Sequence, residues 1–111
     1  MKGDYLGELE ELVFLTISSL QQGDAYGVAI MNEIFEQTGR EVNIGALHSV
    51  LKRLESKGYL KSKMGGATAE RGGRRKRYFV VTPLGKKVTD EIISQKLQLY
   101  ERVLGTTIKI L

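Results

Sequence analysis

The sequence has no Cys and no Trp, and its 111 residues include only one His and one Pro. Without Cys the chain can form no disulfide, no thiolate metal site and no thiol nucleophile. The single His48 lacks the several His, Cys or carboxylate neighbours that a metal site needs, and no oxyanion-hole pattern accompanies it. The absence of Trp excludes a ligand pocket built on stacked indoles. The sequence therefore predicts neither an enzyme nor a protein with a metal or other cofactor.

Long apolar runs are also missing. No stretch of about 18 apolar residues could span a bilayer, and no charged segment followed by an apolar segment resembles a signal peptide. We therefore expect no membrane partner and a cytoplasmic location, which agrees with the lack of Cys. The composition, 41% hydrophobic and 27% charged residues, suffices for one small folded core.

Positive charge is concentrated in the middle of the chain. Residues 40–87 contain thirteen Lys and Arg against three acidic residues, whereas residues 1–39 contain one Lys against seven acidic residues. A basic surface of this kind binds polyanions, because counterions are released when it does so. A basic membrane-surface helix is less favoured, since the charges are spread over a predicted helix and a predicted hairpin.

The densest part of this basic region is residues 71–77, Arg-Gly-Gly-Arg-Arg-Lys-Arg. Guanidinium groups can hold phosphate oxygens bidentately, and glycines allow a tight turn or a close approach to a duplex. A solvated turn is the alternative for such a run considered alone. The surrounding charge favours contact with DNA. The residues predicted to make it are Arg71, Gly73, Arg74, Arg75 and Arg77.

Apolar periodicity predicts two helices near the N-terminus. The first has apolar residues at helical spacing between Leu9 and Leu20. The second extends from about residue 25 to residue 38, with Asp24 as its N-cap and Gly39 as its left-handed stop. Gly27 within this second helix costs about 1 kcal/mol relative to Ala, so we expect close packing against a neighbouring helix there.

A third helix is predicted between its N-cap, Asn43, and Gly58, with a buried stripe of Ile44, Leu47, Leu51 and Leu54. Its opposite face carries small residues first and bases further along. A helix in the major groove reads bases with its N-terminal residues, so small side chains there permit close approach. A thinly covered solvent face is the alternative. The residues predicted to contact DNA are Asn43, Gly45, Ala46, His48, Ser49, Lys52 and Arg53.

Two strand-like runs, residues 59–64 and 76–82, flank a glycine-rich segment and predict a hairpin with a long basic tip. Three helices followed by a hairpin is the order of a winged helix-turn-helix, a mainly α fold of the α+β class. We expect residues 1–82 to form this DNA-binding domain. Residues 83–111 are expected to form a C-terminal dimerisation helix and tail.

The last helix is predicted to begin at Thr82-Pro83, an N-cap followed by proline, and to reach about Leu104. Its apolar stripe is about six turns long, more than so small a domain can cover. An isologous homodimer would bury the stripe, and a helix folded back on its own domain is the alternative. The expected interface residues are Leu84, Val88, Ile92, Ile93, Leu97, Tyr100 and Leu104.

Six segments of the chain form a recognisable set: LGELEELVFL at 6–15, DAYGVAI at 24–30, IGAL at 44–47, LKRLESKGYL at 51–60, GGRRKRY at 72–78 and TPLG at 82–85. Together they resemble the PadR family of bacterial transcriptional regulators. The resemblance covers nearly the whole chain, and its single helix after the hairpin is similar to the compact subgroup. It implies a dimeric repressor of a palindromic DNA operator, released in some members by a phenolic or hydrophobic cationic effector. The family usually has Tyr where this chain has His48, so the phosphate contact made by that Tyr does not carry over.

An effector pocket would lie where the last helix meets the first, and Tyr5, Phe14, Leu97 and Tyr100 are available there, although such residues are more often core. The alternative function is a winged-helix protein-interaction or RNA-binding module without operator specificity. A protein partner would favour large apolar residues at the start of the third helix, where this sequence has small ones.

Overall fold

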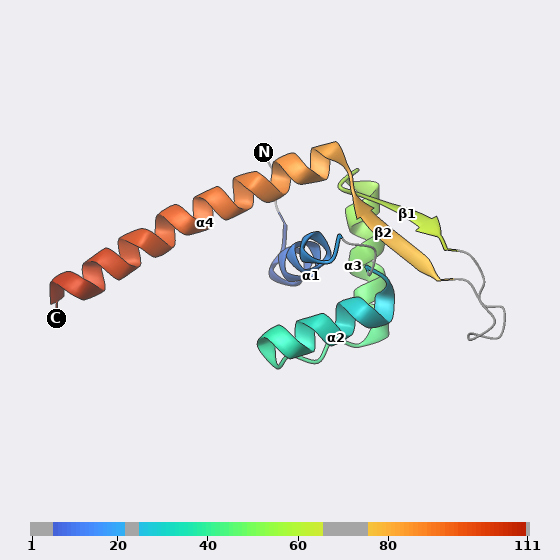
Figure 1. The fold of residues 1–111 in the computed structure, drawn as a ribbon, viewed down its shortest axis with the longest axis horizontal. Coiled ribbons are helices and arrows are strands. Elements are labelled where there is room, and N and C mark those ends of the chain that lie inside the picture. The colour runs from blue at the N-terminus through green and yellow to red at the C-terminus, as the bar shows by residue number, and fades with distance from the viewer. Residues whose placement is uncertain (1–5, 22–24, 66–75, 111) are drawn as a thin grey trace.

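The computed structural model describes residues 6–21, 25–65 and 76–110, with side chains as far as residue 105. These residues form four helices and two strands (Figure 1). Their order along the chain is α1 (Glu8–Ser19), α2 (Gly27–Thr38), α3 (Ile44–Ser56), β1 (Leu60–Met64), β2 (Arg77–Val81) and α4 (Pro83–Ile110). The strands pair antiparallel, from Leu60 opposite Val81 to Met64 opposite Arg77. This arrangement confirms the predicted winged helix-turn-helix with a long C-terminal helix.

The core lies where α1, α2 and α3 meet beneath the sheet. Burial of apolar surface there supplies most of the drive to fold. Phe14 of α1 stacks on Tyr59, with 5.8 Å between ring centroids, and thereby ties the first helix to the segment between α3 and β1. The largest fully buried side chains are Tyr59, Phe14, Ile17, Ile30, Ile34, Leu47, Leu54, Val13 and Val50.

Helix α2 begins two residues later than predicted, because the preceding residues pair with the sheet. The amide of Phe79 donates to the carbonyl oxygen of Ala25 over 2.9 Å, and Tyr26 forms an isolated bridge with the same strand. Tyr26 is therefore extended and serves as the N-cap. A Cβ at Gly27 would meet nothing within 4 Å, so the predicted close packing is wrong. The predicted cap, Asp24, lies outside the described residues.

Helix α3 begins as predicted, with the side-chain oxygen of Asn43 accepting from the amide of Ala46 over 2.8 Å. Its buried face differs from the predicted stripe. Ile44 is 48% exposed, whereas Val50 is fully buried. Val50 lies three residues after Leu47 and four before Leu54, on the same helical face. The packed part of α3 therefore begins one turn after the helix itself.

Helix α4 begins at the predicted cap, because the hydroxyl of Thr82 accepts from the amide of Gly85 over 3.0 Å. It extends to Ile110, six residues beyond the predicted end. Figure 1 shows it leaving the three-helix domain as a single long arm. A side chain at position 85 would collide with the carbonyl oxygen of Tyr59. The joint between the arm and the domain is therefore closely packed.

Candidate nucleic-acid interface

The outer face of α3 carries the side chains predicted to read bases. Gly45, His48, Ser49 and Lys52 are exposed, and Ala46 is half-buried. In the first turn this face carries only Gly45 and Ala46, with the exposed Ile44 at its edge, while a polar pair and a cation follow. A helix face with short side chains at its N-terminal end suits insertion into a major groove, because the helix can approach the bases closely there.

Two other residues predicted for this face have partners within the domain. The Asn43 side chain is exposed but caps the helix. The Nε atom of Arg53 donates to Oε2 of Glu10 over 2.6 Å, although the Arg53 side chain is 54% exposed. Arg53 is therefore at the surface and also held from below by α1.

Glu10 was not predicted as a functional residue. It is nevertheless buried, with only 8% of the residue exposed. Its position offers a signal, because it lies three residues before Val13 and four before Phe14, on the buried face of α1. An acid on an apolar helical face needs partners, and only the three-dimensional structure identifies them.

Three donors surround the Glu10 carboxylate. Besides Arg53, the amide of Gly7 donates over 3.0 Å and Nζ of Lys57 donates over 3.3 Å, both to Oε1. Burial by itself raises the pKa of the Glu10 carboxyl, but these hydrogen bonds and the Lys57 charge outweigh it and hold the pKa below its usual value. The carboxylate therefore stays ionised at neutral pH and joins α1 to the end of α3.

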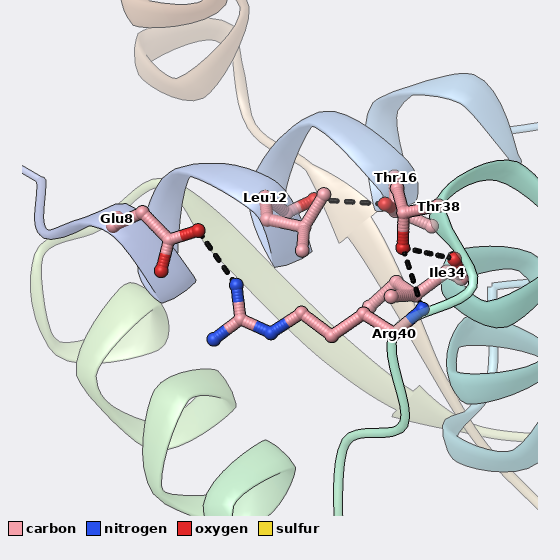
Figure 2. A network of polar contacts seen from close by, with 6 residues as sticks. All are labelled: Glu8, Leu12, Thr16, Ile34, Thr38 and Arg40. Atoms are coloured by element: carbon pink, nitrogen blue, oxygen red, sulfur yellow. Dashed lines mark hydrogen bonds and ion pairs between the residues drawn. The ribbon is translucent and has the colours of Figure 1, made fainter.

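A second ion pair lies on the connection that precedes α3. Figure 2 shows Arg40, between α2 and α3, donating from Nη1 to Oε2 of Glu8 over 2.6 Å. The amide of Arg40 also donates over 3.1 Å to the Thr38 hydroxyl, which donates over 2.7 Å to the carbonyl oxygen of Ile34 (Figure 2). Because the Arg40 and Glu8 side chains are 41% and 76% exposed, this is a surface ion pair of small energy, and α3 does not depend on it.

The described part of the hairpin carries cations on both strands. Lys61 and Lys63 of β1 and Arg77 of β2 are exposed. Nη1 of Arg77 donates to the hydroxyl of Ser62 across the sheet over 3.1 Å. Lys61 and Lys63 were not nominated from the sequence, although alternation along β1 marks them as outward. The other residues predicted for the tip, Arg71, Gly73, Arg74 and Arg75, lie outside the described residues.

The end of the hairpin nearest its tip is anchored to the start of α2. Nζ of Lys76 lies 3.5 Å from the ring centroid of Tyr26, a cation–π contact. The Tyr26 ring meets Tyr78 edge to face, with 5.7 Å between centroids. These contacts join the hairpin to the helix-turn-helix, so that both elements of the candidate interface belong to one unit.

The apolar stripe of α4 is divided in two. Val88 and Ile92 pack partly against the core of their own domain. Beyond them, large apolar side chains are exposed by 43% to 62%. A single chain therefore leaves the outer stripe uncovered, and five of the seven residues predicted for a dimer interface are exposed. The exposed apolar side chains of α4 are Leu84, Ile93, Leu97, Leu99, Tyr100, Val103 and Leu104.

A hollow of about 460 Å³ lies between α1, β2 and the first turns of α4. The hydroxyls of Ser18 and Thr89 meet within it at 3.4 Å. The residues predicted for an effector pocket do not line it, because Phe14 is fully buried in the core while Leu97 and Tyr100 lie further along α4. Tyr5 lies outside the described residues. The lining consists of Leu15, Ser18, Ser19, Gln21, Val81, Lys86, Thr89, Asp90 and Ile93.

The described residues offer no site of two other kinds. Within residues 6–21, 25–65 and 76–110, no three His, Cys, Asp or Glu side chains are grouped so that they could hold a metal ion. None of the helices in this part of the chain is both long enough and apolar enough to cross a membrane.

Comparison with known proteins identifies relatives. Residues 16–91 match the model of the transcriptional regulator PadR-like family. A PadR family transcription regulator from Clostridium difficile is 27% identical, with 87% of this chain and 97% of that chain covered and a TM-score of 0.64. A second, from Eggerthella lenta, is 27% identical, with 90% and 86% covered and a TM-score of 0.66. A transcriptional regulator from Clostridium thermocellum is 26% identical, with 92% and 97% covered and a TM-score of 0.66. No curated protein matches.

Proposed function

Because this chain belongs to the PadR-like family of transcriptional regulators, we propose that it binds a palindromic operator in double-stranded DNA as a homodimer and represses transcription from it. Regulators of this type bind DNA and are not enzymes, and the same holds for this chain. The location proposed for this protein is the cytoplasm, where bacterial DNA lies.

The observation that carries the proposal is the outer face of α3. Gly45 and Ala46 leave room at the N-terminal end of the helix, and the exposed side chains of His48 and Ser49 can reach base edges. Lys52 follows on the same face and suits a phosphate contact. In this arrangement the base-reading residues set operator choice, while the cations set overall affinity.

The hairpin supplies the second part of the interface. Arg77, with Arg71, Arg74 and Arg75 of the predicted tip, would hold phosphates beside the groove that α3 enters, and Gly73 would allow close approach of the backbone. Lys61 and Lys63 add charge on the neighbouring strand. These contacts would be independent of base sequence.

The outer part of α4 is the proposed dimer interface. Ile93, Leu97, Tyr100 and Leu104 recur at steps of four, three and four residues, which fits a helix-to-helix seam. Such side chains, exposed in a single chain, would be covered by the same stripe of a second copy in an isologous contact. The two α3 helices of the dimer would then face successive major grooves, about 34 Å apart.

Release by a small hydrophobic or aromatic effector is part of the proposal. The hollow between α1 and α4 supports it, because a ligand there would contact both the DNA-binding domain and the arm that joins the two copies. Adding an effector should then change the affinity of the protein for its operator. A compound that binds the free and the DNA-bound protein equally well would leave this affinity unchanged.

Selection of bound duplexes from a random pool tests the proposed function. The expected result is an enriched palindrome whose half-sites are about one helical turn apart, centre to centre. Binding without enrichment, or preference for single-stranded RNA or a protein over duplex DNA, would instead support an interaction module without operator specificity.

A further inference from the structure

Glu10 is the only acidic residue that is buried among those the structure describes. Its side chain is 11% exposed, whereas the side chain of its partner Arg53 is 54% exposed. The carboxylate is thus covered while the guanidinium reaches the surface of α3. Lys57, 24% exposed, provides a second positive charge beside the same carboxylate. The three charges together leave one net positive charge at this edge of α3.

The geometry of the contact leaves the outer end of Arg53 available. A guanidinium has one N–H on Nε and four on its two terminal amino groups. Glu10 accepts from Nε, and the terminal amino groups have no hydrogen-bond partner in the part of the chain that is described. These are the groups that grip phosphate oxygens as a fork. A guanidinium already fixed at Nε has less side-chain freedom to lose when it binds.

We propose that Glu10 is a positioning residue for DNA binding, which fixes Arg53 through Nε so that its terminal amino groups hold a backbone phosphate beside α3. This rests on the proposed function, in which α3 meets a duplex. Arg53 lies one turn beyond Ser49, away from the N-terminal residues that would read bases, where contacts to the backbone are expected. Glu10 itself touches no DNA and acts through Arg53.

The test measures the affinity of the whole chain for a random duplex and for the selected operator at several salt concentrations. Glu10→Gln keeps the shape of the side chain and removes its charge. It should weaken both complexes alike, roughly three- to tenfold, because Arg53 must then be ordered on binding. Arg53→Ala should weaken both and lower the slope of log K against log salt by about 0.9, the value of one phosphate contact.

Two further variants separate positioning from charge. Arg53→Lys keeps the positive charge but has no fork to be oriented, so it should resemble Glu10→Gln more than wild type. The double variant Glu10→Gln/Arg53→Ala should bind no more weakly than Arg53→Ala alone, because Glu10 has nothing left to position. If Glu10 only stabilised the fold, the loss of affinity caused by Glu10→Gln would add to the loss caused by Arg53→Ala in the double variant.

Glu8→Gln is the matched control. It removes the same charge from the same turn of α1, but Glu8 is 76% exposed and pairs with Arg40 outside α3. Its affinity and salt slope should equal those of wild type. Thermal unfolding of every variant sets the temperature of the titrations, which must lie well below the lowest midpoint, so that loss of folded protein does not imitate loss of affinity.

The outcomes are distinguishable. If Arg53→Ala binds a random duplex with wild-type affinity and slope, the inference is wrong whether or not Glu10→Gln folds. If Glu10→Gln binds DNA with the affinity of wild type or more tightly, Glu10 does not position Arg53 for DNA. A higher affinity would mean that the ion pair with Glu10 keeps Arg53 away from the phosphate. If wild type binds no duplex at all, the proposed function itself fails, a result separate from failure at Glu10.

Discussion

The hydroxyl of Thr82, at the start of α4, donates a hydrogen bond over 2.6 Å to the carbonyl oxygen of Gly58, just past the end of α3. The amide of Thr82 also donates to the carbonyl oxygen of Tyr59 over 3.0 Å. Gly58 has a φ of 83°, a left-handed conformation that residues with a Cβ rarely adopt. The end of the candidate recognition helix and the start of the candidate dimerisation helix are therefore joined directly.

Packing at this joint predicts the effect of Gly85→Ala. The new methyl group would collide with the carbonyl oxygen of Tyr59 and crowd the Val81 side chain, so the free energy of unfolding should fall by about 1–3 kcal/mol. Gly27→Ala is the control, since a Cβ there meets nothing within 4 Å and should leave stability unchanged or raise it. Urea unfolding of the three proteins at equal concentration measures both effects. Equal midpoints would show that the joint can relax at no cost.

The outer stripe of α4 predicts the oligomeric state. Leu97→Glu would put a charge into the seam of the proposed dimer, so the dimer should give way to monomer or to unfolded chain. Gln95→Glu, at another exposed position of α4, is the control for added charge and should remain dimeric. Sedimentation at micromolar concentration distinguishes the states. A wild-type protein that is already monomeric there would contradict the dimer proposal.

The lowered pKa of Glu10 predicts how stability depends on pH. Burial opposes the shift, but the Gly7 amide, Arg53 and Lys57 prevail, so the folded state binds the Glu10 proton less readily than the unfolded chain. This stabilisation is complete above the unfolded pKa, about 4.3, and is lost as pH falls through the folded pKa. Urea unfolding from neutral pH to about pH 3 should therefore show a smaller acid-induced loss in Glu10→Gln than in wild type. Glu8→Gln, which keeps Glu10 and its three donors, is the control and should retain the loss that Glu10 contributes.

Hairpin and helix should affect DNA binding in different ways. Replacing Arg74, Arg75 and Arg77 with Ala should weaken operator and random duplex alike and flatten the slope of log K against log salt by about 0.9 per lost contact. Replacing His48 or Ser49 with Ala should lower the operator-to-random ratio, because base contacts carry about 1–3 kcal/mol of discrimination. Titrations of both sets on both duplexes separate the two. An unchanged salt slope in the triple variant would mean that the basic run is a solvated turn.

Features set by neighbouring residues were predictable from the sequence. The Asn43 and Thr82 caps, the paired strands and the exposed face of α3 all follow from local chemistry and from periodicity. The late start of α2 was not predictable, because Ala25 pairs with a strand more than fifty residues away in the sequence. The Glu10–Arg53 contact likewise joins residues 43 positions apart. Periodicity could mark Glu10 as facing inward, but it could not identify what the carboxylate meets.

Because α4 is long, a small change in its angle to the DNA-binding domain produces a large displacement at its far end. Its 28 residues extend about 42 Å. If two such arms pack together along their outer turns, a tilt of about 5° at one joint swings the far end of that arm, and the partner copy with it, by nearly 4 Å relative to the domain, slightly more than the roughly 3.4 Å between successive base pairs. Angular stiffness at Thr82, Gly58 and Gly85 would then determine which half-site spacing the dimer accepts. A few degrees of tilt there would be enough to move α3 out of register with its groove.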